Sequence, residues 1–189
     1  DLFLTLHFGM TGYLKTYEEV EDRPKGTRVS FELEDGFMAW VNPRKFGRVG
    51  LTDDVQSFFK EKNFGEDALT ISKSDFVQIF QSTKGPIKSR LMDQKNVAGV
   101  GNIYADEILF QCGIHPETDS RELSKKSLEQ VHSVMKEVFD VAIDRKAQYD
   151  TYPKHYLLFD RSEERQNPPL SRIKVGGRTT YFDPKTQKK

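Results

Sequence analysis

A glycine-containing turn leads directly into the clearest helical pattern of this sequence. The turn reads Val97-Ala98-Gly99-Val100-Gly101-Asn102, and helical periodicity follows from Asn102 to Cys112, before Gly113. The apolar residues of one helical face are Ala105, Leu109 and Cys112. A helix that starts after glycines offers unpaired N–H groups and the positive end of its dipole, both of which suit a phosphate. An ordinary turn has the same composition, so this segment alone leaves both interpretations open.

Helical patterns continue on both sides of this block. The sequence predicts them at 55–59 after Asp53-Asp54, at 76–80 after Ser72 or Ser74, at 87–92, and from Ser124 or Ser127 to 142. Residues 63–68 read as a linker. The lysine and arginine residues that flank the Val97–Asn102 turn are Lys84, Lys88 and Arg90. Two helix pairs around such a turn resemble a helix–turn–helix that faces a nucleic-acid backbone.

The two ends of the chain read as β-structure. Residues 1–51 alternate apolar and polar side chains between turn signals, which predicts a mainly antiparallel set of strands. Residues 171–182 alternate around Gly176-Gly177, as in a β-hairpin. Strands, then helices, then a hairpin indicate an α+β protein, with expected divisions at 1–62, 63–160 and 161–189.

Composition excludes several classes of protein. The 189 residues are 36% apolar and 31% charged, too apolar for a disordered chain, and 29 basic residues balance 29 acidic ones. No apolar stretch approaches the ~18 residues of a membrane helix. The single cysteine, Cys112, excludes an internal disulfide and a multi-cysteine zinc site, and fits a reducing compartment.

The charge is nevertheless sorted along the chain. Between Gln166 and Lys189 the only acidic residue is Asp183, whereas basic residues recur. Arg178 lies near the tip of the predicted hairpin, where a guanidinium could contact a phosphate through two N–H groups. A solvated hairpin end explains the same residues equally well.

A second candidate surface lies among the N-terminal strands. Asn42-Pro43-Arg44-Lys45-Phe46-Gly47 places Arg44 and Phe46 two residues apart, so they share a face if the segment is extended. Such a pair could fill the gap left by an extruded base. A core phenylalanine beside a surface arginine is the more common arrangement, and Met10 also reads more readily as a core residue.

Other catalytic patterns are absent from the sequence. The four histidines show no metal-ligand spacing with carboxylates or Cys112, and there is no nucleophilic triad and no Walker phosphate-binding motif. Asp106 and Glu107 read as a solvated or capping pair rather than as a catalytic dyad.

Taken together, these segments resemble the formamidopyrimidine-DNA glycosylase / endonuclease VIII family. Residues 91–116 resemble its helix–two-turn–helix, and residues 176–182 its DNA-gripping hairpin. His7–Gly12 and Pro43–Gly47 resemble its two void-filling segments. The resemblance runs in order over nearly the whole chain. It implies a partial N-terminal antiparallel β-sandwich, a helical helix–two-turn–helix domain and a C-terminal β-hairpin.

The resemblance implies base-excision repair of damaged double-stranded DNA. In the family, an N-terminal proline amine attacks the sugar C1′ and forms a Schiff base, so the enzyme is both a glycosylase and an abasic-site lyase. By motif match, three residues fill the void left by the flipped base: Met10, Arg44 and Phe46. Four hold the kinked backbone: Lys84, Lys88, Asn102 and Tyr104. Arg178 grips phosphate and has the family's proton-donor role in elimination, whereas Glu107 is structural or a modest helper.

The chain also departs from the family pattern. It begins downstream of the positions of the nucleophilic proline, its glutamate and an N-terminal lysine, so we expect this polypeptide alone to be inactive. Ser162–Pro169, Asp183 and Thr186 stand where the family has zinc-binding cysteines. This resembles the zincless-finger variants, and no zinc or other cofactor is expected. Gly26 replaces a histidine that often contacts DNA, and residues 149–160 leave little room for a loop over 8-oxoguanine, so base preference stays open.

Three interpretations of function therefore compete. The first is a glycosylase/lyase acting on 8-oxoguanine, formamidopyrimidine or oxidised pyrimidines, and the second is a non-catalytic protein that binds damaged or abasic DNA. The third is a helix–two-turn–helix module for RNA or protein, which Met10, Arg44 and Phe46 disfavour because a void-filling triad has no purpose without a flipped base. We expect a monomer without membrane association, inside the cell where the DNA is: cytoplasm or nucleoid in a bacterium, nucleus in a eukaryote.

Overall fold

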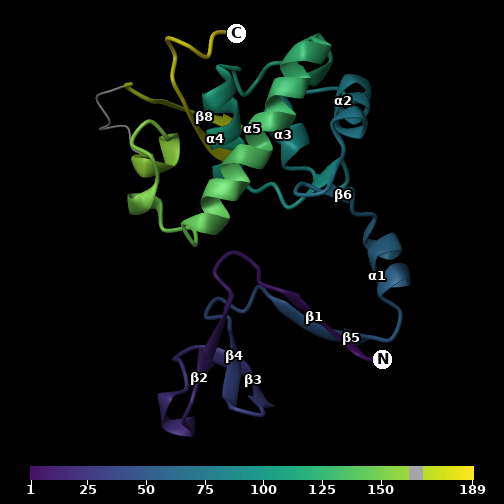
Figure 1. Cartoon of the computed structure of the whole chain (residues 1–189), viewed down its shortest axis with the longest axis vertical. Helices are drawn as coiled ribbons and strands as arrows, with labels where there is room; N and C mark the ends of the chain where they lie inside the picture. Colours follow the sequence, from purple (N-terminus) through teal and green to yellow (C-terminus); the bar gives the residue numbers. More distant parts are fainter. Residues whose placement is uncertain (162–167) are drawn as a thin grey trace. The chain divides into compact units, whose positions relative to one another are not determined.

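The computed structural model describes residues 1–161 and 168–189. The chain separates into two compact units, residues 1–62 and residues 63–189 (Figure 1). The first unit contains most of the strands, and the second contains most of the helices and the C-terminal hairpin. The predicted α+β class is therefore confirmed. No helix among the described residues is long and apolar enough to span a membrane.

The first unit is built from antiparallel strands. β1 (Phe3–His7) pairs with β5 (Arg48–Thr52), and a second sheet has the order β2-β4-β3. Its strands are β2 (Tyr13–Tyr17), β4 (Gly36–Val41) and β3 (Thr27–Leu33). A short 3₁₀ helix, η1 (Val20–Asp22), lies between β2 and β3, and helix α1 (Val55–Lys62) ends the unit. The buried residues of β4 are Ala39, Trp40 and Val41.

The helices of the second unit begin where the sequence signals them. α2 (Lys73–Ser82) is capped by Ser72, and α5 (Lys125–Asp144) by Ser124; each side-chain hydroxyl accepts a hydrogen bond from an N–H of the first turn. Two shorter helices lie between them in sequence: α3 (Ile87–Leu91) and α4 (Asn102–Cys112). Gly113 ends α4 in the left-handed conformation, at φ 65°.

One local prediction was wrong. Residues 63–68 were expected to be a linker, but β6 (Glu66–Asp67) pairs in parallel with β7 (Val97–Ala98). Two-residue strands are too short to show alternation, so sequence periodicity could not reveal them. The pairing ties the start of the second unit to the turn before α4.

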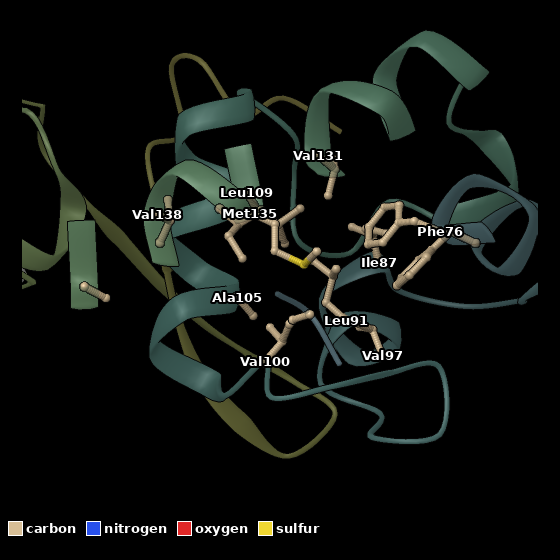
Figure 2. Packing of buried hydrophobic residues seen from close by; sticks show 14 of the residues in the cluster. Phe76, Ile87, Leu91, Val97, Val100, Ala105, Leu109, Val131, Met135 and Val138 are labelled. Atoms are coloured by element: carbon tan, nitrogen blue, oxygen red, sulfur yellow. The ribbon is translucent and has the colours of Figure 1, made fainter. Parts of the chain in front are cut away.

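Apolar side chains from all four helices form one core in the second unit (Figure 2). The rings of Phe76 and Phe80 stack with centroids 4.3 Å apart. Met135 of α5 points toward Leu91 and Leu109, and all three are fully buried. Figure 1 shows α5 running across the unit, and it packs against both α2 and α4. This core fixes the position of the turn that precedes α4.

The chain ends in the predicted hairpin. β8 (Ser171–Val175) pairs with β9 (Arg178–Phe182) around Gly176 and Gly177, which have φ values of 55° and 75°. Three short 3₁₀ helices complete the unit: η2 (Ser120–Glu122), η3 (Tyr149–Thr151) and η4 (Leu157–Phe159). Most of the segment Ser162–Pro169, matched to the family's first cysteine pair, lies outside the described residues.

Candidate nucleic-acid interface

A buried carboxylate joins the hairpin to the helices of the second unit. Oδ1 of Asp106, on α4, lies 2.7 Å from Nζ of Lys88 on α3, and neither side chain is exposed. Nη2 of Arg161 forms a second ion pair with Oδ2 of Asp106. The main-chain N–H of Tyr181, on β9, donates to the same Oδ2 at 3.1 Å. Three segments that are distant in sequence therefore meet at one acidic side chain.

This arrangement corrects the prediction for Lys88. Its ammonium group is fully buried and also donates to Oγ1 of Thr180 at 2.6 Å and to the carbonyl of Thr179 at 3.2 Å. Burial lowers the pKa of Lys88, while the charge of Asp106 acts in the opposite direction. With its donors directed at these internal partners, Lys88 supports the hairpin and is not placed to contact a phosphate.

The other contacts of β9 place the hairpin tip beside α3 and α4. Nδ2 of Asn102 donates to the carbonyl of Thr179 at 3.2 Å. A Cβ atom at Gly176 would lie 2.7 Å from Oγ of Ser89 on α3, so the tip sits close against that helix. Arg178 follows the tip and is exposed. The hairpin thus presents Arg178 to solvent from a base that contacts α3 and α4.

The start of α4 lies in the same unit and offers main-chain N–H groups that could bind an anion. Its N-cap residue is Gly101, which makes no side-chain capping bond. The first N–H groups of a helix have no partner within it, here those of Asn102, Ile103 and Tyr104. Asn102 was expected either to cap α4 or to bond an anion; it is not the cap residue, and its Nδ2 bonds the hairpin. Lys84, which precedes α3, is exposed.

The side chain of Tyr104 packs against other aromatic residues of the second unit. The hydroxyl lies 3.4 Å from that of Tyr152, and the ring packs against Phe139 at 5.4 Å. Burial raises the pKa of Tyr104 to about 12. A phosphate contact from this residue would therefore use its main-chain N–H rather than its phenol.

Asp106 and Glu107 are both buried, so the expectation of a solvated or capping pair was wrong. Glu107 accepts a hydrogen bond from the N–H of Leu158 at 2.7 Å and from Nε2 of Gln111 at 2.8 Å. Glu107 thus fixes η4 against α4. Sequence reasoning missed the role of Asp106 and did not single out Arg161, because their partners are far away along the chain.

The first unit exposes the residues matched to void filling. Met10 is 61% exposed and Phe46 57% exposed, so the interpretation of both as core residues is wrong. The guanidinium carbon of Arg44 lies 5.1 Å from the centroid of the Phe46 ring. Large apolar side chains facing solvent next to a cation are suited to insertion between stacked bases.

Hydrogen bonds close the end of the hairpin. The buried side chain of Asp183 accepts from the N–H of Lys185 and from Oγ1 of Thr186, both at 2.8 Å. Gln187 accepts from the N–H of Asp183 at 2.7 Å and donates to the carbonyl of Ile114 at 2.8 Å. Among residues 1–161 and 168–189, no three His, Cys, Asp or Glu side chains are grouped as metal ligands would be.

Comparison with family models finds two matches in chain order. Residues 1–49 match the formamidopyrimidine-DNA glycosylase N-terminal domain, and residues 65–152 match the formamidopyrimidine-DNA glycosylase H2TH domain. The formamidopyrimidine-DNA glycosylase of Synechocystis is 30% identical, with 99% of this chain aligned to 72% of the relative. That of Streptococcus pyogenes is 32% identical, with 100% of this chain aligned to 75% of the relative.

Solved structures give the same result. The Lactococcus lactis formamidopyrimidine-DNA glycosylase bound non-covalently to DNA containing an abasic site is similar, with a TM-score of 0.84 and 27% identity. The similarity covers 100% of this chain and 75% of that one. A mutant of the Lactococcus lactis protein in complex with DNA containing Fapy-dG has a TM-score of 0.84 and 28% identity, covering 100% and 76% of the two chains.

Proposed function

This chain belongs to the formamidopyrimidine-DNA glycosylase family, and from that premise we propose that the native protein flips and removes an oxidised base and then nicks the strand by β,δ-elimination. At the coarser level, the chain is a DNA glycosylase of base-excision repair. The proposed lesions are 8-oxoguanine, formamidopyrimidine and oxidised pyrimidines. We further propose that it acts as a monomer on double-stranded DNA.

The exposure of Met10 and Phe46 carries the proposal. Each places a large apolar side chain in solvent, which is unfavourable for the isolated protein. When a base leaves the duplex, the vacated space is apolar, flat and bounded by stacked bases. Insertion of these side chains would remove them from water and support the opened stack, while Arg44 replaces the lost hydrogen bonds.

The second unit supplies the groups proposed to hold phosphates. The exposed Lys84 and Arg178 contribute charge, and the N–H groups at the start of α4 contribute donors. Arg178 has a second proposed role, that of proton donor in elimination. Asn102 would contribute its main-chain N–H at the start of α4, because its side-chain donor Nδ2 is already bonded to the carbonyl of Thr179.

A second candidate function is non-catalytic binding of damaged or abasic DNA. Among the site residues matched to the family, Arg178 alone has a proposed chemical role; the others are proposed to serve binding, apart from Lys88 and Glu107, which support the fold. We therefore propose that this polypeptide by itself binds abasic DNA without forming a Schiff base.

Borohydride trapping tests the second proposal, and a binding measurement on the same duplexes tests the preference for damaged DNA on which both proposals depend. The 189-residue chain is mixed with a duplex that contains one natural abasic site, reduced, and analysed by intact-mass spectrometry, with binding followed by fluorescence anisotropy. We expect tighter binding than to the undamaged duplex, and no covalent adduct. An adduct would show that an amine within these residues attacks C1′, and equal binding to both duplexes would contradict the DNA-damage function.

A further inference from the structure

Two loops of the first unit are joined by one buried amide. The first loop, residues 8–12, carries Met10, and the second loop, residues 42–47, carries Arg44 and Phe46. Asn42 is only 1% exposed, and its Nδ2 donates to the carbonyl oxygen of Phe8 at 3.0 Å. The same oxygen accepts from the N–H of Gly12 at 2.9 Å, which closes the first loop. Asn42, in the second loop, therefore bonds the same carbonyl oxygen of Phe8 that closes the first loop.

The second loop is held from the same residue. The carbonyl of Asn42 accepts from the N–H of Lys45 at 3.2 Å and from Nε of Arg28 at 3.1 Å. Nη2 of Arg28 donates to the next carbonyl, that of Pro43, at 3.2 Å. Lys45 has a φ of 58°, an uncommon conformation for a residue with a side chain. The turn that presents Arg44 and Phe46 is thus fixed by Arg28 from one side and by Asn42 from within.

There is little space between the loops. A Cβ atom at Gly9 would lie 3.0 Å from the Cβ atom of Phe46, and one at Gly12 would lie 2.8 Å from Nδ2 of Asn42. One at Gly47 would lie 2.5 Å from the ring of Trp40 and closer still to Nδ2 of Asn42. The two loops are therefore packed closely against each other.

We infer that Asn42 and Arg28 are positioning residues that set how well this protein distinguishes a duplex with a vacant base position from an intact one. They hold Met10, Arg44 and Phe46 as a single preformed wedge, so that insertion orders few additional groups. The inference rests on the proposed function, because the wedge has a purpose only if it enters a gap in DNA. Neither residue needs to touch DNA for this role.

The test compares affinity for two duplexes that differ at one position. One contains a tetrahydrofuran abasic-site analogue with 2-aminopurine opposite, and the other has a normal nucleotide in place of the analogue. We expect Asn42→Ala to reduce the ratio of the two affinities by about tenfold, equivalent to about 1.4 kcal/mol. The 2-aminopurine fluorescence change on binding should shrink as well, because it reports on insertion into the gap.

Arg28→Lys is the second variant, chosen because the Arg28 side chain is exposed and the positive charge is kept. It removes the paired bonds to the carbonyls of Asn42 and Pro43, so the ratio should fall here too. Tyr17→Phe is the matched control, because it removes the hydrogen bond to Ser30 in the same unit without touching either loop. Trp40, the only tryptophan, reports by its fluorescence whether each variant keeps the first unit folded.

The outcomes separate the inference from the proposed function. If folded Asn42→Ala and Arg28→Lys variants keep the wild-type ratio, or lose affinity equally for both duplexes, the positioning role is overturned. If the wild-type chain itself shows no preference for the abasic duplex, the proposed function fails, and the inference fails with it.

Discussion

Nζ of Lys88 lies 2.7 Å from Oδ1 of Asp106, and both side chains are excluded from solvent. A carboxylate transferred from water into the protein interior requires charged or hydrogen-bonding partners, and Asp106 has Lys88, Arg161 and the N–H of Tyr181. The pairing fastens α3, α4 and β9 to each other. The position of the exposed Arg178 therefore depends on a buried acid that would never touch DNA.

The first prediction concerns the loss of that acid. Asp106→Asn leaves two cations facing a neutral amide, and we expect it to destabilise the second unit by about 3–5 kcal/mol. Lys88→Met should be milder, because Arg161 still neutralises Asp106. Urea unfolding followed by circular dichroism at 222 nm measures the effect, since the second unit holds most of the helical residues. A larger loss in Lys88→Met than in Asp106→Asn would contradict this order.

The second prediction separates exposed cations from the buried one. Arg178→Ala and Lys84→Ala should each flatten the slope of log affinity against log salt concentration by roughly one charge, because each would remove one of the proposed phosphate contacts. Lys88→Met should leave the slope unchanged, since that ammonium is internal. Anisotropy titrations over a range of potassium chloride concentrations give the slopes. An unchanged slope for Arg178→Ala would remove that residue from the interface.

Lys88 and Arg178 were both predicted to contact phosphate, and the structure shows that only Arg178 is exposed. The difference shows which features local sequence patterns can predict. The end of a helix at Gly113 and the turn at Gly176-Gly177 depend on residues within one turn of each other, and they were predicted. The two helix starts were each predicted to within a pair of serines, of which the structure uses Ser72 and Ser124. The buried pair joins residues 88 and 106, and its second cation is residue 161, so no local pattern could indicate it.

For Met10 and Phe46, the local residue type predicted the wrong environment. Their residue types favour the interior, and only the structure shows that both face solvent. They were predicted to fill a void in DNA from the order of four motifs along the chain, not from the physical chemistry of either residue. Asn42 was visible only as part of a motif, because its link to Phe8 spans 34 positions.

The third prediction tests how tightly the two loops are packed. Gly47→Ala would place a methyl group against Nδ2 of Asn42 and the ring of Trp40, so we expect it to destabilise the first unit by about 1–3 kcal/mol. Gly50→Ala is the matched control, because its methyl group would meet only Oγ1 of Thr5, which can rotate away. Trp40 fluorescence during urea unfolding reports on both. Equal destabilisation by the two variants would argue against the close packing around Asn42.

The fourth prediction concerns alkaline pH. Burial raises the pKa of Tyr104 from 10.0 to about 12, so between these values the unfolded chain releases a proton that the folded chain keeps. The contribution of Tyr104 to stability is therefore complete below pH 10 and is lost as pH rises through 12. Tyr104→Phe removes this contribution, and its unfolding free energy should fall less steeply than that of the wild type over this range. Parallel curves for the two proteins would show that Tyr104 does not titrate late.

The fifth prediction concerns what holds the end of the hairpin. Asp183 and Gln187 are linked to each other and to Ile114 by hydrogen bonds, which connect the chain end to the loop after α4. We therefore propose that the hairpin needs no metal, and expect a chelator such as EDTA to leave the thermal unfolding midpoint unchanged. Asp183→Ala should lower the thermal unfolding midpoint, because the N–H of Lys185 and Oγ1 of Thr186 lose their acceptor. A buried group left without its partner costs about 1–3 kcal/mol of stability. Lys185→Ala is the control, because its side chain is exposed and its N–H still bonds Asp183. A midpoint that falls with EDTA and is restored by zinc would show that a metal, rather than these hydrogen bonds, closes the hairpin.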